Sequence, residues 1–313
     1  MLQHAKGNTI SFTLKPVAPF RLDYTVWALR RRPDNAIDRW DGAAWSRVHE
    51  LDAEGICEVR VTQAGPPENP LLRVLASGKK LTKDAKTPIR SLLTRMLGLE
   101  MDLSGFYDLT RHQGAMAALA ERFRGVRLPR FPTLFEALVN GIACQQLSLT
   151  VGIILLNRLA ESYGARLSTP EGTAFGFPRP EKLAGADIAG LRKLGFSHQK
   201  AQALIELSNR VSHKAVDLPG LEAMDNEEAR GKLLELRGIG RWTADYALLR
   251  GMGRFMIFPA GDVGARNRLQ DVLHISKSLD DEGVRRRLRK WDSYAGLIYL
   301  HLLLSGLAEE GRL

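Results

Sequence analysis

A Gly-Ile-Gly tripeptide at residues 238–240 separates two apolar helical patterns and is the first part of this chain suited to binding a ligand. Two glycines around one apolar residue permit a tight turn between helices. The second helix would then direct unpaired N–H groups and the positive end of its dipole at an anion such as phosphate. Arg237 and Arg241 flank the turn and add positive charge. An ordinary helix corner ended by glycine explains the tripeptide equally well, so this motif alone leaves both interpretations open.

A carboxylate follows in the loop at residues 257–263. Pro259 and Gly261 favour a loop, and Asp262 lies where the N-cap of the next helix is expected. In the simpler interpretation Asp262 only caps that helix. In the functional one it is a carboxylate fixed at the mouth of a cleft, close to the hairpin at residues 233–246. The combination of hairpin, helix, Pro/Gly loop and Asp is a more specific signal than the hairpin alone or the loop with its Asp alone.

This combination resembles the helix–hairpin–helix/Gly-Pro-Asp superfamily of DNA base-excision glycosylases. Within that superfamily, residues 125–306 are similar to the 3-methyladenine DNA glycosylase II family, the alkylation-repair branch. The likeness rests on the segment 135–148, which ends in Gln-Gln-Leu-Ser, on Gly-Ile-Gly-Arg-Trp-Thr-Ala at 238–244, and on Trp-x-Ser-Tyr at 291–294. The first hundred residues match only weakly.

The predicted fold class is α+β. A small N-terminal domain of mixed sheet and helix (1–110) precedes an all-α helix–hairpin–helix glycosylase core of two helical subdomains (111–313). Period-two alternation predicts strands at 9–14, 45–51, 57–62 and 71–75, whereas 20–29 fits a strand or a short helix and 88–97 a helix. Thr133, with Glu136 three residues later, predicts a capping box at the start of a core helix.

Composition narrows the choice of partners. The chain has 313 residues, a net charge of +10 and a pI of about 9.8, which favours polyanions, nucleic acid first among them. A solvated basic surface is the simpler alternative. The N-terminus lacks the apolar run of a signal peptide, and no uncharged stretch reaches ~20 residues, so no membrane association is expected. A cytoplasmic protein is predicted, nucleoid-associated if bacterial.

The residues that commonly bind metals or form disulfides are sparse. Cys57 and Cys144 are the two cysteines and lie far apart, which excludes a disulfide framework and a four-cysteine iron–sulfur cluster. The seven histidines show no metal-ligand spacing. No cofactor is predicted to be required. The resemblance implies one possible structural ion, Na⁺ or K⁺, at the hairpin carbonyls of Leu236 and Gly238.

The resemblance also implies roles around an extruded base. Asp262 is the predicted catalytic residue, stabilising positive charge on the sugar and orienting the attacking water. Trp242, Tyr246 and Trp291 are the predicted base pocket, an aromatic cage suited to a cationic alkylated purine. Taken singly, each aromatic residue is equally compatible with core packing.

The predicted DNA contacts lie on either side of this pocket. Leu147 matches the family's wedge, an apolar side chain that fills the gap left by the flipped base, although an isolated Leu is usually a core residue. Gln146 precedes it. The hairpin is predicted to hold a DNA phosphate through Gly238, Ile239, Gly240, Arg241 and Thr243.

Bifunctional relatives carry a lysine nucleophile in the second helix of the hairpin. Trp242 occupies the matching position here, and Thr243 and Ala244 offer no amine. Water is therefore the predicted nucleophile, and no β-lyase step is expected.

The sequence therefore predicts a monofunctional DNA glycosylase that removes alkylated purines of the 3-methyladenine and 7-methylguanine type. Its predicted partner is double-stranded DNA containing damaged bases, and the enzyme is predicted to be a monomer. Two alternatives stay open. An oxidised- or deaminated-base glycosylase of the same fold is supported by Asp245, where the alkylation branch often has Asn. A non-catalytic DNA-binding module would use the hairpin alone.

Two departures from the family pattern are Arg237 in place of a frequent Pro, and Ala260-Gly-Asp where an acidic residue often precedes the Asp.

Overall fold

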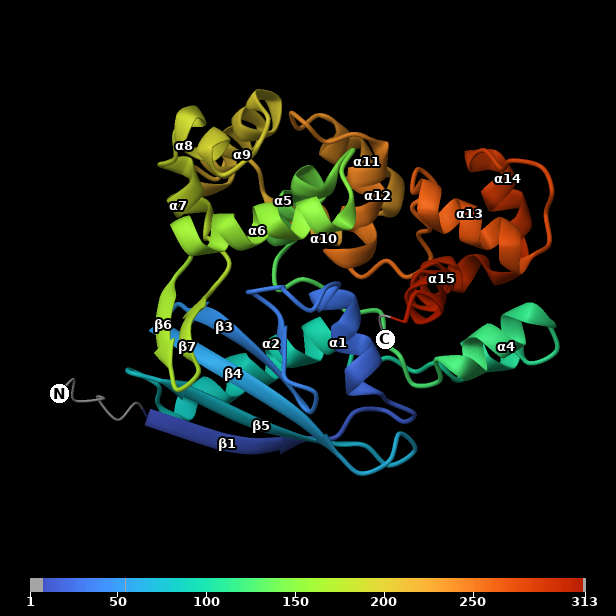
Figure 1. The fold of residues 1–313 in the computed structure, drawn as a ribbon, viewed down its shortest axis with the longest axis horizontal. Helices are drawn as coiled ribbons and strands as arrows, with labels where there is room; N and C mark the ends of the chain where they lie inside the picture. Colours follow the sequence, from blue (N-terminus) through green and yellow to red (C-terminus); the bar gives the residue numbers. More distant parts are fainter. Residues whose placement is uncertain (1–7, 54, 312–313) are drawn as a thin grey trace.

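A five-stranded antiparallel sheet forms the N-terminal part of the computed structural model, which describes residues 8–53 and 55–311. Its strand order is β1-β5-β4-β3-β2. The strands are β1 (Asn8–Leu14), β2 (Arg39–Trp40), β3 (Ala44–Leu51), β4 (Gly55–Ala64) and β5 (Leu71–Gly78). Alternation along β5 turns Leu72, Val74 and Ala76 into the core, where α1 (Leu22–Arg30) and α2 (Lys86–Leu97) cover them. Figure 1 shows both helices beside the sheet.

A second layer of helices stacks above the sheet around one apolar core. Its main helices are α5 (Leu134–Cys144), α6 (Leu149–Tyr163), α9 (His198–Ser212), α11 (Asn226–Leu234) and α12 (Arg241–Arg250). Three short helices complete it: α7 (Pro180–Ala184), α8 (Ile188–Lys193) and α10 (Leu218–Ala223). The helix α5 is buried along almost its whole length, which makes it the central element of this layer.

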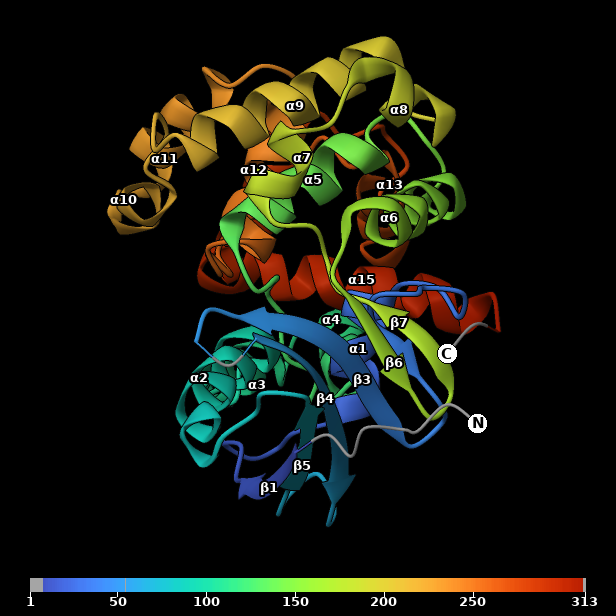
Figure 2. The same cartoon turned by 90° about the vertical axis from the view of Figure 1, so that its left-hand side faces the viewer.

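A third group of helices surrounds α15 (Ala295–Glu309) and shares a separate apolar core. It contains α3 (Ser104–Thr110), α4 (Ala115–Arg122), α13 (Val263–Val272), α14 (Asp281–Leu288) and the 3₁₀ segment η2 (Arg289–Tyr294). Figure 2 shows α15 lying between the sheet and the upper helices. Trp27 and Ala28 of α1 also pack into this core. Because the core contains residues from both sides of position 110, the predicted domain boundary there stays a prediction.

The predicted strands and the predicted helix before residue 97 are confirmed, with η1 (Lys83–Ala85) leading into that helix. The segment 20–29, for which strand and helix both stayed open, is helical from residue 22, where α1 begins. The predicted capping box is only half correct. Thr133 Oγ1 accepts a hydrogen bond from the Glu136 N–H at 3.1 Å, but the Glu136 carboxylate turns to another partner.

An unpredicted ribbon joins the helical layer to the sheet. Its strands, β6 (Arg166–Thr169) and β7 (Gly172–Phe175), pair with each other, and Gly176 forms a parallel bridge with Val48 of β3. Both views place the ribbon beside β3 (Figures 1 and 2). Strands of four residues give too short an alternation to be read from sequence. In the described residues, every helix is too short or too polar to cross a membrane.

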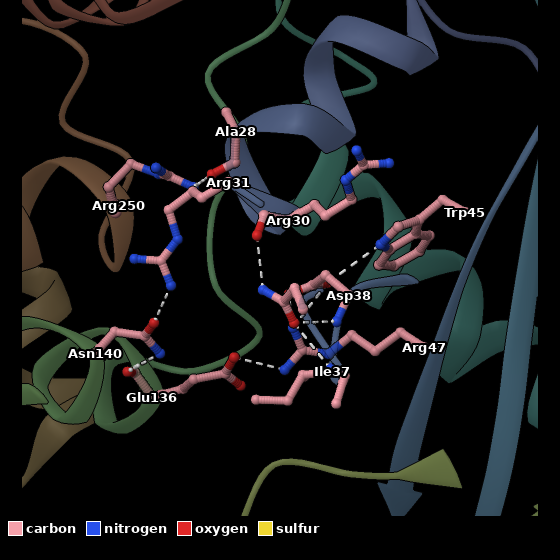
Figure 3. Close-up of polar contacts among 12 residues, drawn as sticks. Ala28, Arg30, Arg31, Ile37, Asp38, Trp45, Arg47, Glu136, Asn140 and Arg250 are labelled. Carbon is pink, nitrogen blue, oxygen red and sulfur yellow. Dashed lines mark hydrogen bonds and ion pairs between the residues drawn. The ribbon is translucent and has the colours of Figure 1, made fainter. Parts of the chain in front are cut away.

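A buried ion-pair network fixes the sheet to α5 (Figure 3). Arg47 of β3 donates to Asp38 at 2.9 Å and to Glu136 of α5 at 2.5 Å, and is only 1% exposed. Burial raises the pKa of Glu136 to about 7, because the interior disfavours its charged form more than Arg47 stabilises it. Two buried carboxylates therefore share one counter-charge, the guanidinium of Arg47.

Arg47→Met is expected to lower the free energy of unfolding by ~3–5 kcal/mol, because it leaves buried carboxylates without a counter-charge. Urea denaturation at pH 7 would measure it. The matched control is Arg60→Met, which removes an exposed ion pair with Asp41 and should change stability by less than ~1 kcal/mol. Equal losses in both variants would contradict the role given to Arg47.

Candidate functional site

One groove of about 770 Å³ collects nearly all the predicted site positions. It runs between the segment after α5, the hairpin before α12 and the loop before α13. Its lining residues are Cys144, Gln145, Gln146, Leu147, Gly238, Ile239, Gly240, Arg241, Trp242, Thr243, Gly261, Asp262 and Val263. The structure therefore brings together the predicted wedge, the predicted phosphate-binding turn and the predicted catalytic carboxylate.

The hairpin has the geometry that the glycine pair predicts. Gly238 has a φ of 78°, and a Cβ there would lie 2.7 Å from the Ala203 methyl group, so both backbone and space require glycine. Gly240 is the N-cap of α12, and no side chain caps that helix. The first N–H groups of α12 are thus left for an external acceptor beside the groove.

The segment between α5 and α6 holds Leu147 at the surface, where it is 41% exposed. Gln145 ties this segment to the hairpin: its Nε2 donates to the Gly238 carbonyl at 2.7 Å and to Thr243 Oγ1 at 2.6 Å. Lys200 of α9 fixes the other side by donating to the carbonyls of Ala143 and Gln145, at 2.9 and 2.7 Å. An exposed apolar side chain is thereby carried by a rigid backbone.

Asp262 is a helix N-cap and also lines the groove. It is the N-cap of α13, where Oδ1 accepts a hydrogen bond from the Ala265 N–H at 3.0 Å. Its Oδ2 accepts one from the Tyr299 hydroxyl at 2.8 Å. Burial and the neighbouring Asp262 charge raise the pKa of Tyr299 well above its usual value, so this phenol keeps its proton and donates. Tyr299 could not be singled out from sequence, because it lies in a helix whose pattern is mostly apolar.

Asp262 also lines a second cavity of about 480 Å³, whose walls are made mainly of leucine and aromatic side chains. The Trp242 and Tyr246 rings stack there, with centroids 5.3 Å apart and planes 20° from parallel. Trp27 and Arg31 enter from the N-terminal part of the chain. Sequence reasoning missed both, because nothing local connects them to residues more than two hundred positions later. Asp262, Trp242 and Leu147 line both cavities; with Cys144 they form the boundary between them.

Trp291 is not brought to either cavity. It lies in η2 with a φ of −119°, and its ring is 6% exposed inside the core around α15. The kinked backbone between α14 and α15 turns the ring inward. The predicted grouping of Trp291 with Trp242 and Tyr246 is therefore not what the structure shows.

Asp245 also faces away from the cavities. It accepts a hydrogen bond from Arg230 Nε at 2.7 Å and is 6% exposed, in an ion pair that joins α11 to α12. Burial raises the pKa of Asp245, and Arg230 opposes that rise. Asp245 therefore packs the hairpin and does not contact the cavities.

The hairpin carbonyls predicted for a monovalent cation already accept hydrogen bonds. The Leu236 oxygen accepts from the Ile239 N–H at 3.1 Å, and the Gly238 oxygen from Gln145. Each carbonyl keeps a second lone pair, so a cation would have to share these oxygens with the donors. In the described part of the chain, no cluster of three or more His, Cys, Asp or Glu residues could hold a metal ion.

Residues 139–293 match the family model of the HhH-GPD superfamily base excision DNA repair protein. The Escherichia coli DNA-3-methyladenine glycosylase 2 is 33% identical over 192 residues, which cover 60% of this chain and 64% of that enzyme. The Bacillus subtilis protein YfjP, provisionally named a DNA-3-methyladenine glycosylase, is 26% identical over 285 residues, 91% of this chain and 95% of that protein.

Solved structures share the fold over nearly the whole chain. The 3-methyladenine DNA-glycosylase from Archaeoglobus fulgidus has a TM-score of 0.81 and 24% identity, and the match covers 94% of this chain and 97% of that one. The Clostridium acetobutylicum 8-oxoguanine glycosylase/lyase, in complex with double-stranded DNA, has a TM-score of 0.77 and 16% identity, with 98% of each chain covered. These matches confirm the predicted α+β fold and do not discriminate between lesions.

Gln145→Leu is expected to loosen the wedge segment, residues 145–148 between α5 and α6, because it removes both hydrogen bonds to the hairpin. Hydrogen–deuterium exchange at residues 145–148 and 238–240 should become ~10-fold faster, as loss of one to two net hydrogen bonds implies. Gln146→Ala is the control, since its amide makes no bond to the hairpin among the described residues. Unchanged exchange in Gln145→Leu would show that Lys200 alone holds the segment.

Proposed function

The chain belongs to the HhH-GPD superfamily of base excision DNA repair proteins, and we propose that it is a monofunctional glycosylase removing alkylated purines from double-stranded DNA. The observation that carries this proposal is the place of Asp262. Its carboxylate lies at the boundary between a groove with DNA-binding features and an aromatic cavity large enough for a base. The names of the relatives support 3-methyladenine as a lesion, and 7-methylguanine is proposed as a second alkylated purine of the same kind.

The two cavities suit the two parts of a flipped nucleotide. The N-glycosidic bond is inaccessible inside a duplex, so the base has to leave the stack at a cost of a few kcal/mol. Leu147 would fill the gap it leaves, and the first N–H groups of α12 would hold the neighbouring phosphate. Stacking on Trp242 and Tyr246 then replaces the lost base stacking, and a cationic base gains ~1–2 kcal/mol by cation–π attraction.

The position of Asp262 supports a mechanism for cleavage of the C1′–N bond. The C1′–N bond breaks with its electron pair passing to the base, and positive charge develops on the sugar. A fixed carboxylate in a site of low dielectric stabilises that charge without reorganising. The same carboxylate orients the water that attacks C1′. Tyr299 and the start of α13 hold one oxygen each, so the carboxylate is positioned before substrate binds.

The absence of an amine at the cavities supports a monofunctional reaction. Trp242 occupies the position of the lysine in bifunctional relatives, and the described lining of both cavities contains no lysine. Lys200, which contacts the segment after α5, donates to two backbone carbonyls there. Water is therefore the proposed nucleophile. A monomer is part of this proposal.

The alternatives have less support. Asp245 was the basis of the oxidised-base alternative, and it forms an ion pair away from both cavities. A non-catalytic binding module would need the hairpin but no carboxylate beside an aromatic cavity. A Na⁺ or K⁺ ion at Leu236 and Gly238 remains a proposal about hairpin stability and not about the reaction.

Asp262→Asn is expected to lower the single-turnover rate by ~10²–10³-fold or more, because it removes the charge that stabilises the transition state. Asn is an equally good N-cap, so folding and DNA affinity should change little. The assay would use duplexes that each carry one lesion: 3-methyladenine, 7-methylguanine, hypoxanthine, uracil or 8-oxoguanine. Release of alkylpurine, with strand cleavage only after hot alkali, is the expected wild-type result.

Three outcomes of that assay would contradict the proposal. Near-normal rates in Asp262→Asn would remove Asp262 from the mechanism. Strand cleavage without alkali would mean a lyase activity. DNA binding without release of any base would favour the binding module.

Leu147→Ala is expected to slow excision from a matched duplex about tenfold more than from a mismatched one. A lesion in a mismatch is already partly unpaired, so it depends less on an apolar plug. Paired single-turnover assays with the same lesion opposite a matched or a mismatched base would measure this. Equal slowing on both duplexes would indicate that Leu147 only packs the segment.

A further inference from the structure

Arg237 is an exposed arginine that directly precedes the turn of the hairpin. Within the turn, Gly238 and Gly240 are exposed, whereas Ile239 is buried beneath them. The uncapped N–H groups of α12 begin at the other end of the same turn. A positively charged side chain therefore lies beside the groups that are proposed to hold a DNA phosphate.

The charge of Arg237 has no counter-charge on the protein. Among the described residues, no carboxylate forms an ion pair with this guanidinium. Glu235, the acidic residue nearest to it along the chain, pairs with Lys232 at 3.1 Å. Arg237 Nη2 donates instead to a neutral acceptor, Gln202 Oε1, at 2.8 Å. A guanidinium has five N–H donors, so most of them stay available to an acceptor from outside the protein.

The neighbouring helix α9 fixes both Arg237 and the turn. Gln202 lies on α9, and the next residue, Ala203, packs so closely on Gly238 that a Cβ there would lie 2.7 Å from its methyl group. From the other side, Gln145 Nε2 donates to the Gly238 carbonyl at 2.7 Å. The guanidinium and the turn thus have a fixed arrangement before DNA binds, which reduces the side-chain entropy lost on binding.

Arg241, on the other side of the turn, is exposed as well, but its charge is partly compensated. Its Nε lies 3.6 Å from one oxygen of Asp281, whose other oxygen lies 4.0 Å from Arg266. Its charge also acts on the carboxylates of Glu227 and Asp245. Of the two arginines that flank the turn, Arg237 therefore has the less compensated charge.

We propose that Arg237 binds a second phosphate of the DNA backbone, next to the phosphate held by the first N–H groups of α12. This inference rests on the proposed function, in which the hairpin binds DNA. A guanidinium suits a phosphate because its fork of donors matches two phosphate oxygens. The N–H groups of α12 contribute hydrogen bonds and a partial charge, whereas Arg237 contributes a full charge.

A contact of this kind has two measurable consequences. Each phosphate that a protein neutralises releases counter-ions from DNA, so the logarithm of the association constant falls with the logarithm of salt concentration by ~0.9 per phosphate. Phosphates are also the same in damaged and undamaged DNA, so the contact positions the duplex and does not select the lesion. Arg237 should therefore strengthen binding to any duplex by the same factor.

Arg237→Gln is expected to make the salt dependence shallower by ~0.9 and to weaken binding ~5–10-fold near 0.1 M salt, as loss of one phosphate contact implies. Fluorescence anisotropy between about 50 and 200 mM salt would measure both quantities. The wild-type background serves for an undamaged duplex. The Asp262→Asn background, which is expected to slow turnover strongly, serves for a duplex with 7-methylguanine. Both duplexes should lose affinity by the same factor.

Arg73→Gln is the matched control. Arg73 is an exposed arginine of β5 that forms no ion pair among the described residues. Both views place β5 at the opposite end of the molecule from α9 and α11 (Figures 1 and 2). The control removes the same charge but should leave the slope unchanged, because exposed charges separated by more than ~10 Å are largely screened at 0.1 M salt. Arg237→Lys, which keeps the charge, should also retain the wild-type slope.

Three results would overturn the role of Arg237. They are an unchanged slope in Arg237→Gln, an equal reduction in Arg73→Gln or Arg237→Lys, and a loss of affinity confined to the damaged duplex. Melting temperatures equal to that of the wild type would exclude misfolding as the cause of a change. Failure of the wild type to release any base, together with the expected change in slope, would contradict the glycosylase function and leave the contact between Arg237 and DNA standing.

Discussion

The buried contacts between the N-terminal sheet and α5 are the constraint on which the site depends. Arg47 joins β3 to Glu136, and Arg31 joins the end of α1 to Asn140 one turn later on α5. Charges removed from water have to be paired with good geometry, so these contacts allow little freedom in how α5 sits on the sheet. The C-terminal end of α5 continues into the wedge segment. The hydrogen bond from Gln145 then fixes that segment relative to the hairpin.

Asp262 combines a structural contact with the position proposed for the catalytic carboxylate. As the N-cap of α13, its carboxylate is held by a backbone N–H and stabilised by the positive end of the helix dipole. Tyr299 holds the other oxygen from α15. A carboxylate that already satisfies the start of a helix needs no further reorganisation to face a substrate, and this is what electrostatic stabilisation of a cationic sugar requires.

Charged side chains of opposite sign lie on the two sides of the proposed sugar–base bond. A carboxylate lies on the side proposed for the sugar, and the guanidinium groups of Arg31 and Arg250 lie on the side proposed for the base. Breaking a bond between sugar and base separates charge along that line, positive toward Asp262 and negative toward Arg31. The aromatic walls between them stack on any base and so contribute to retention more than to choice.

The sequence by itself determined the features whose signals are local. The glycine pair and the N-cap at Asp262 each follow from neighbouring residues, because turns and caps are set by backbone preferences within a few positions. Leu147 was expected at the surface only because of the family resemblance. Trp27, Arg31 and Tyr299 come from elements far apart in the chain, and only tertiary packing decided that they share a cavity with Asp262. Packing also turned Trp291 into the core and Asp245 toward Arg230. The direction of a side chain depends on how its helix is rotated against distant neighbours, and no local pattern contains that information.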